Sequence, residues 1–198
     1  MPSQEKKPGP WGAFIAVLLF VGLIAAWALV PGRVLEATWQ AEQAQVKAWA
    51  GEGANRWIMS QAAGAMSGAA KDAEKTATGL GDSLIERWLT DRIYASLLWA
   101  NIIIYRAQAL VMWGLLGMPL VLAASVDGFY VREIRKNAFI SQSPIRHTIG
   151  VHFFRLVTVV MVVWLCLPIP APIIAAPAVL LFASLSLWLW VGNLQKRL

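Results

Sequence analysis

The residue types that nucleophilic catalysis needs lie together in one polar stretch of the second half of the chain. Residues 126–155 contain one aspartate, two serines and two histidines: Asp127, Ser141, Ser143, His147 and His152. A serine nucleophile also needs an ordered base and an oxyanion hole, and the stretch has no nucleophile-elbow or similar motif. We therefore predict that the chain is not an enzyme. An intramembrane enzyme that uses Ser143 or His147 is kept as the lesser alternative.

Metal and cofactor chemistry is not indicated either. His147 and His152 are five residues apart, which on a helix places them about 140° apart around the axis, a poor arrangement for gripping one ion. Cys166 is the only cysteine, so the chain has neither a zinc pattern nor a disulfide framework. No phosphate-binding glycine loop and no paired carboxylates within a span are present. We predict no catalytic residue, no metal and no cofactor.

The composition is that of a protein embedded in a membrane. Of the 198 residues, 58% are hydrophobic and 14% charged, and the mean hydropathy is +0.58. Because about 20 apolar residues suffice to cross a bilayer as a helix, we predict an all-α integral membrane protein with four transmembrane helices. The predicted spans are residues 11–30, 107–126, 156–170 and 173–194. A cleaved signal peptide is the alternative for the first, because Lys6 and Lys7 precede it.

The distribution of positive charge predicts the orientation. The basic loop at residues 127–155 carries five basic residues against two acidic ones, and such loops stay in the cytoplasm. The tails at residues 1–10 and 195–198 are also basic, so both termini should be cytoplasmic. Residues 31–106 form the extracytoplasmic segment, where seven basic residues face eight acidic ones if Arg106 is set aside. The net charge of +6 therefore reflects topology, and we predict no sequence-specific nucleic-acid binding.

The extracytoplasmic segment should be helical. Residues 33–77 are rich in strong helix formers, which predicts one long helix or two helices broken at residues 50–53. Its apolar residues leave an uneven stripe: Leu35, Trp39, Val46, Trp49, Ile58, Ala62 and Met66. Residues 84–105 could cover this stripe as an antiparallel hairpin and run directly into the second span, or lie in the headgroup layer instead. Arg106, at the outer edge of that span, is expected to extend its guanidinium to the interface.

The cytoplasmic stretch should begin as a basic amphipathic helix. Over residues 129–139 the cations share one side and apolar residues the other, and a turn is predicted at residues 141–147. Such a helix can rest on anionic lipid or bind an acidic partner. The candidate contact residues are Arg132, Arg135, Lys136, Arg146 and His147.

The order of these segments, together with a set of residues around the basic loop, resembles a known family. The residues that carry the likeness are Asp127 and Gly128, Arg132 and Arg135, Ser143, His147 and His152. The chain resembles inner-membrane proteins encoded on integrating conjugative elements and conjugative plasmids, of the type called domain of unknown function 4400. The resemblance implies a place in the bacterial inner membrane beside a type IV secretion system. It also implies partners among the secretion components or the coupling ATPase.

We therefore predict a non-enzymatic accessory or scaffold component of conjugative DNA transfer that acts through protein–protein contacts, with a homo-oligomer also possible in principle. A small channel or transporter subunit is the alternative. It is suggested by polar residues at a span edge, Arg106 and Gln108, and by potential bending points at Gly114, Gly117 and Pro119.

Overall fold

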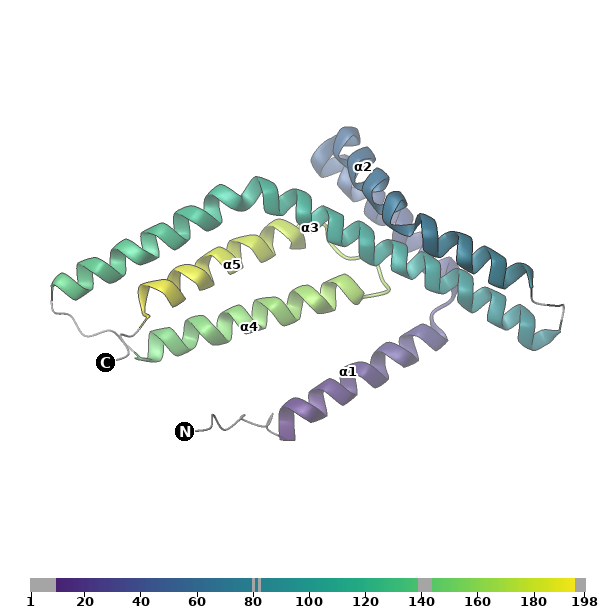
Figure 1. Cartoon of the computed structure of the whole chain (residues 1–198), viewed down its shortest axis with the longest axis horizontal. Coiled ribbons are helices and arrows are strands. Elements are labelled where there is room, and N and C mark those ends of the chain that lie inside the picture. Colours follow the sequence, from purple (N-terminus) through teal and green to yellow (C-terminus); the bar gives the residue numbers. More distant parts are fainter. Residues whose placement is uncertain (1–9, 80, 82, 139–143, 195–198) are drawn as a thin grey trace.

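The computed structural model describes residues 10–79, 81, 83–138 and 144–194 (Figure 1). Within them every regular element is an α-helix: α1 (Pro10–Leu29), α2 (Gly32–Thr78), α3 (Leu84–Asn137), α4 (Pro144–Cys166) and α5 (Ala175–Gly192). Three of these, α3, α4 and α5, are long and apolar enough to cross a membrane. A fourth candidate span in this part of the chain is a pair, the apolar part of α1 joined to α2 at a bend of 102°. The all-α class is confirmed, with three or four candidate spans.

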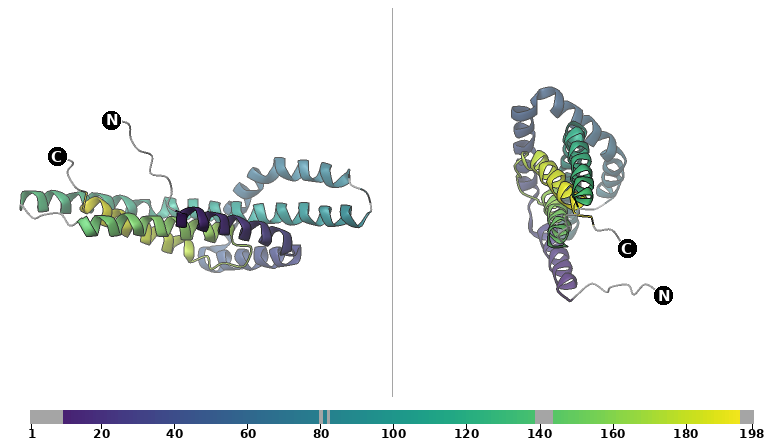
Figure 2. Two further views of the ribbon diagram at one scale, coloured as in Figure 1. Left: turned by 90° about the horizontal axis from the view of Figure 1, so that it is seen from below. Right: turned by 90° about the vertical axis from the view of Figure 1, so that its left-hand side faces the viewer.

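Helix α2 is bent at a glycine. It extends over 47 residues, and Gly51 within it has a φ of 85°, a left-handed conformation that glycine adopts without a Cβ clash. Of the two arrangements left open by the sequence, the helix broken within residues 50–53 is therefore the one found. The bend places the two arms of α2 on either side of α3 (Figure 2). The second arm and the first part of α3 form the antiparallel hairpin expected from the sequence.

The apolar stripe of α2 is largely the face that packs on α3. Four of its members are buried: Leu35, Val46, Ile58 and Ala62. Trp39 meets Tyr105 of α3 edge to face, with ring centroids 4.9 Å apart. Trp49 departs from the prediction, because 65% of its surface is exposed. It lies two residues before the bend at Gly51.

Helix α3 is continuous from the antiparallel hairpin, which we call the outer hairpin, to the basic residues at its other end. Its 54 residues make it about 80 Å long. It begins with a capping box, in which the Ser83 hydroxyl accepts from the Glu86 N–H and the Glu86 carboxylate accepts from the Ser83 N–H. The expectation that residues 84–105 run directly into the next span is confirmed. Pro119 lies inside the helix, and α3 is bent in the half that contains it (Figure 1).

Helix α5 lies between α3 and α4 and approaches both closely through glycines. A Cβ added at Gly150 of α4 would lie 3.0 Å from the backbone N of Trp190. One added at Gly128 of α3 would lie 3.1 Å from the carbonyl O of Trp188. Only residues without a side chain allow backbones this near to each other. The three helices therefore form one bundle, whereas α1 contacts the rest mainly through its last turns.

The polar stretch at residues 127–155 is mostly helical. Its first part continues α3 as far as Asn137, so the predicted basic helix exists as the end of a longer one. The turn predicted at residues 141–147 is wrong for residues 144–147, which form the first turn of α4. Pro144 begins that helix, because proline has no N–H to leave unsatisfied in a first turn. Ser141 and Ser143 lie outside the described residues.

Candidate functional site

A buried ion pair joins α2 to α3 near the end of α4. Arg106 has 0% of its side chain exposed and Glu42 has 1%. The Arg106 Nε lies 3.1 Å from each carboxylate oxygen of Glu42, and its Nη2 also contacts Oε1. Burial removes water from both charged groups, which costs free energy. This cost is offset by the close contact of the two groups and by further hydrogen bonds to each of them.

The same arginine holds the end of α4. Its Nη1 donates to the carbonyl oxygens of Trp164 at 2.6 Å and Leu167 at 2.7 Å, and its Nη2 donates to that of Ile169 at 2.8 Å. The last carbonyls of a helix have no partner within the helix, so this guanidinium satisfies groups that would otherwise be stranded.

Helix α2 binds the residues that follow, which connect α4 to α5. The Glu42 carboxylate accepts from the Ala171 N–H at 3.2 Å, and the Gln45 side-chain oxygen accepts from the Ile173 N–H at 3.0 Å. We call Glu42, Gln45, Arg106 and the connection at residues 164–173 the polar clamp. The clamp fixes the α4–α5 hairpin against the outer segment.

The expected role of Arg106 at the interface is therefore corrected. Its guanidinium does not extend to the membrane surface, because Glu42 and the carbonyls of the α4–α5 connection enclose it. The Nε, Nη1 and Nη2 groups of Arg106 all donate to protein oxygens, so none is left to bind a transported solute. The channel or transporter alternative thus loses Arg106, one of the residues that suggested it.

A second arginine of α3, Arg92, binds carbonyl oxygens at the end of α1, as Arg106 does at the end of α4. The Nη1 of Arg92 donates to the carbonyl oxygens of Trp27, Ala28 and Val30 at 3.0, 3.2 and 3.0 Å. Arg92 lies about four helical turns before Arg106, on nearly the same face of α3. The carboxyl ends of α1 and α4 are thus both attached to one side of α3, as expected if α1 and α4 cross a membrane in the same direction.

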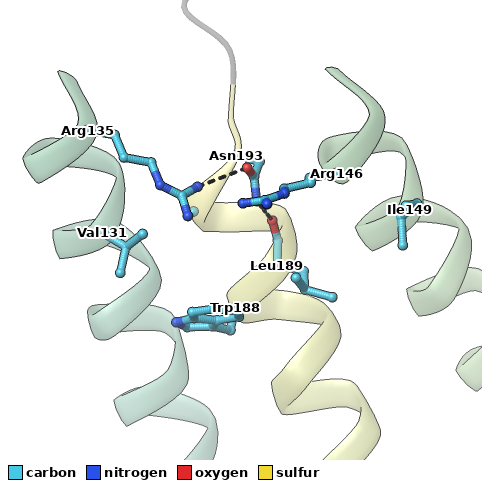
Figure 3. Close-up of a pocket in the computed structure, with 8 residues that line it drawn as sticks. Val131, Arg135, Arg146, Ile149, Trp188, Leu189 and Asn193 are labelled. Carbon is cyan, nitrogen blue, oxygen red and sulfur yellow. Dashed lines mark hydrogen bonds between the residues drawn. The ribbon is translucent and has the colours of Figure 1, made fainter. Parts of the chain in front are cut away.

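At the other end of the bundle, two of the predicted contact residues come together. Arg135 of α3 and Arg146 of α4 line one cavity of about 270 Å³ beside the end of α5 (Figure 3). We call it the basic cavity. Its described lining residues are Val131, Arg135, Arg146, Ile149, Trp188, Leu189, Gly192 and Asn193.

Asn193 lies between the two arginines, and Figure 3 shows both guanidinium groups turned toward it. Arg135 Nη1 donates to its side-chain oxygen at 3.1 Å, and its side-chain nitrogen donates to the Leu189 carbonyl at 2.8 Å. The neighbouring Trp188 is fixed from α3, because its indole N–H donates to Asp127 at 2.6 Å. Neither Asn193 nor Asp127 was predicted to have these roles.

The other three predicted contact residues do not line this cavity. Arg132 and Lys136 lie roughly 100° and 140° around α3 from Val131, on the flank of the helix. Lys136 pairs with Glu133 at 3.1 Å, and Arg132 is partly exposed. His147 is partly buried, and its Nδ1 has no hydrogen-bond partner among the described residues. Apart from His147, the predicted contact residues therefore divide into two pairs. Arg135 and Arg146 form a cavity pair, and Arg132 and Lys136 form a flank pair.

Within residues 10–79, 83–138 and 144–194, no three histidine, cysteine, aspartate or glutamate side chains are grouped so that they could hold a metal ion. The serines considered for catalysis lie outside these ranges. The prediction that the chain is not an enzyme remains a prediction. The cations of the cavity pair and of the flank pair are suited to binding anions or acidic surfaces.

Comparison with known proteins identifies a family. A family model described as "IncC plasmid conjugative DNA transfer protein DtrJ-like" matches residues 24–195, which include all of α2 to α5 and both sites above. No curated protein and no solved structure matches the chain.

Proposed function

The chain belongs to the DtrJ-like family of IncC plasmid conjugative DNA transfer proteins, and we propose that it serves conjugation as a non-enzymatic scaffold in the inner membrane. In this proposal both termini are cytoplasmic and α2 with the first part of α3 lies outside. The expected partners are components of a type IV secretion system or its coupling ATPase. Membership of the type called domain of unknown function 4400, which the sequence suggested, stays part of the proposal.

One observation carries the scaffold role. A single continuous helix, α3, bears the outer hairpin at one end and the flank pair Arg132 and Lys136 at the other. A continuous helix keeps its two ends at a fixed separation and rotation. Two partners on opposite sides of a membrane could thus be held in register by one element, with no chemistry at either contact.

The polar clamp, together with Arg92, supports the same role. Arg92 and Arg106 attach the ends of α1 and α4 to α3, and Glu42 attaches α2. The orientation of α3 within the bundle is therefore fixed by charged groups that are costly to separate. The flank pair should present a positive surface to an acidic partner, for which charge complementarity mainly steers association.

A photocrosslinker placed beside the flank pair tests this proposal. Phe129 is 49% exposed and lies about 20° from Lys136 around α3, so benzoylphenylalanine can replace it conservatively. In mating donors we expect this position to yield an adduct with a transfer protein encoded by the same element, identified by mass spectrometry. The matched control is Phe182 of α5, which is 50% exposed and should yield no such adduct. Capture of lipid alone at position 129, in donors that still transfer DNA, would contradict the scaffold proposal.

A further inference from the structure

We propose that the basic cavity binds the phosphate headgroup of an anionic phospholipid. This goes beyond the transfer role and does not depend on it. Arg135 and Arg146 come from different helices and line the same small space. Phosphate is a ligand that guanidinium groups recognise through paired, charge-assisted hydrogen bonds.

Among the described residues that line the cavity, the charge favours an anion. Its eight described lining residues include two arginines and no acidic residue. The hydrogen-bond acceptor next to Arg135 is the neutral amide of Asn193, at 3.1 Å. The next residue of the same helix, Lys136, instead has a carboxylate partner in Glu133. An anion entering the cavity would meet positive charge from two helices.

The remaining lining favours a ligand with an apolar part. Apolar residues from all three helices line the cavity beside the arginines: Val131, Ile149, Trp188 and Leu189. Ile149 also lines a second, more open groove along α4, of about 530 Å³, with Ile145, Phe153 and Leu156. Ile149 lines both spaces, so the groove lies next to the cavity, and an acyl chain could lie along the groove while its phosphate occupies the cavity. A free phosphate would leave the groove unused.

The position of the cavity also suits a lipid. Trp188 and Trp190 lie at this end of α5, where indole rings favour the headgroup level of a bilayer. Basic pockets between membrane helices are known to hold anionic headgroups, and each cation near such a surface contributes on the order of 1 kcal/mol.

The test is a titration of the detergent-purified full chain with phosphatidylglycerol, followed by native mass spectrometry. The variant Arg135→Gln with Arg146→Gln should weaken binding roughly 30-fold. Its matched control, Arg132→Gln with Lys136→Gln, removes the same charge from the same end of the bundle. This control should bind within about twofold of the unchanged chain, because neither of its cations lines the cavity.

A second variant guards against loss of folding in the first. Ile149→Trp keeps both arginines and fills the cavity from a residue that is 53% exposed, so the fold should tolerate it. It too should weaken binding of phosphatidylglycerol. Circular dichroism and size-exclusion profiles identify any variant that is unfolded, and Ile149→Trp then decides the result.

Three results would overturn the inference. Equal losses in the two double variants would show attraction to diffuse charge. Equal binding of phosphatidylcholine, which has no net charge, would show that the headgroup charge is not recognised. Competition by glycerol 3-phosphate at the concentrations that suffice for phosphatidylglycerol would assign the cavity to a soluble phosphate. None of these results bears on DNA transfer, so this inference can fail while the proposed function stands.

Discussion

Replacing Arg106 with methionine is expected to lower the free energy of unfolding by about 3–5 kcal/mol, because it leaves a buried charge without its partner. Glu42, with 1% of its side chain exposed, would keep only the Ala171 N–H among the hydrogen bonds described above. The carbonyl oxygens at the end of α4 would lose their donor as well. The measurement is thermal unfolding of the detergent-purified protein, followed by circular dichroism.

The matched control is Lys47→Met on the same helix as Glu42. Lys47 and Glu52 also form an ion pair, 3.4 Å apart, but their side chains are 44% and 61% exposed. Breaking an exposed pair should cost less than about 1 kcal/mol. The double variant Glu42→Met with Arg106→Met should recover part of the loss, because no charge is then left unpaired. Equal effects of Arg106→Met and Lys47→Met would contradict the polar clamp.

The second large effect is expected from charge reversal on the flank of α3. Arg132→Glu with Lys136→Glu turns two attractive contacts with an acidic partner into repulsive ones, and like charges across an interface cost several kcal/mol. We expect DNA transfer from donors that carry this variant to fall at least about tenfold, since 1.4 kcal/mol already corresponds to that factor in association. The measurement is the number of recipients that receive the element per donor.

The control for this variant keeps both positions and both charges. Arg132→Lys with Lys136→Arg exchanges the two cations, and it should support transfer at the level of the unchanged chain. Membrane fractions must contain equal amounts of each variant, because cytoplasmic cations also influence orientation during insertion. Unchanged transfer with the charge-reversed variant, at an equal membrane level, would exclude the flank pair as the partner contact.

The sequence was sufficient for features that depend on local patterns. Apolar runs predicted the membrane helices, and the glycines at residues 51 and 53 predicted the bend in α2. The absence of a breaker between residues 84 and 105 predicted that α3 would continue into its span. Besides the exposed Trp49, a local error concerned Pro144, which was taken as part of a turn. Proline also fits the first turn of a helix, and α4 begins there.

The polar clamp could not be predicted in the same way. Arg106 and Glu42 are 64 residues apart, and no local pattern relates them. Glu42 counted only as one of several charges in a nearly neutral segment. The available signal was a lone arginine between apolar runs, which by default marks a buried or functional charge. The basic cavity was found in part, because Arg135 and Arg146 were both named, but their separation from Arg132 depends on how α3 and α4 meet α5.

The role in conjugation is tested most directly by removing the gene from a donor strain without disturbing its neighbours. Transfer of the mobile element is then counted with and without a complementing copy of this chain. Our account predicts that transfer collapses in the deletion strain and returns with the complementing copy. Transfer at an unchanged frequency in the deletion strain would contradict it.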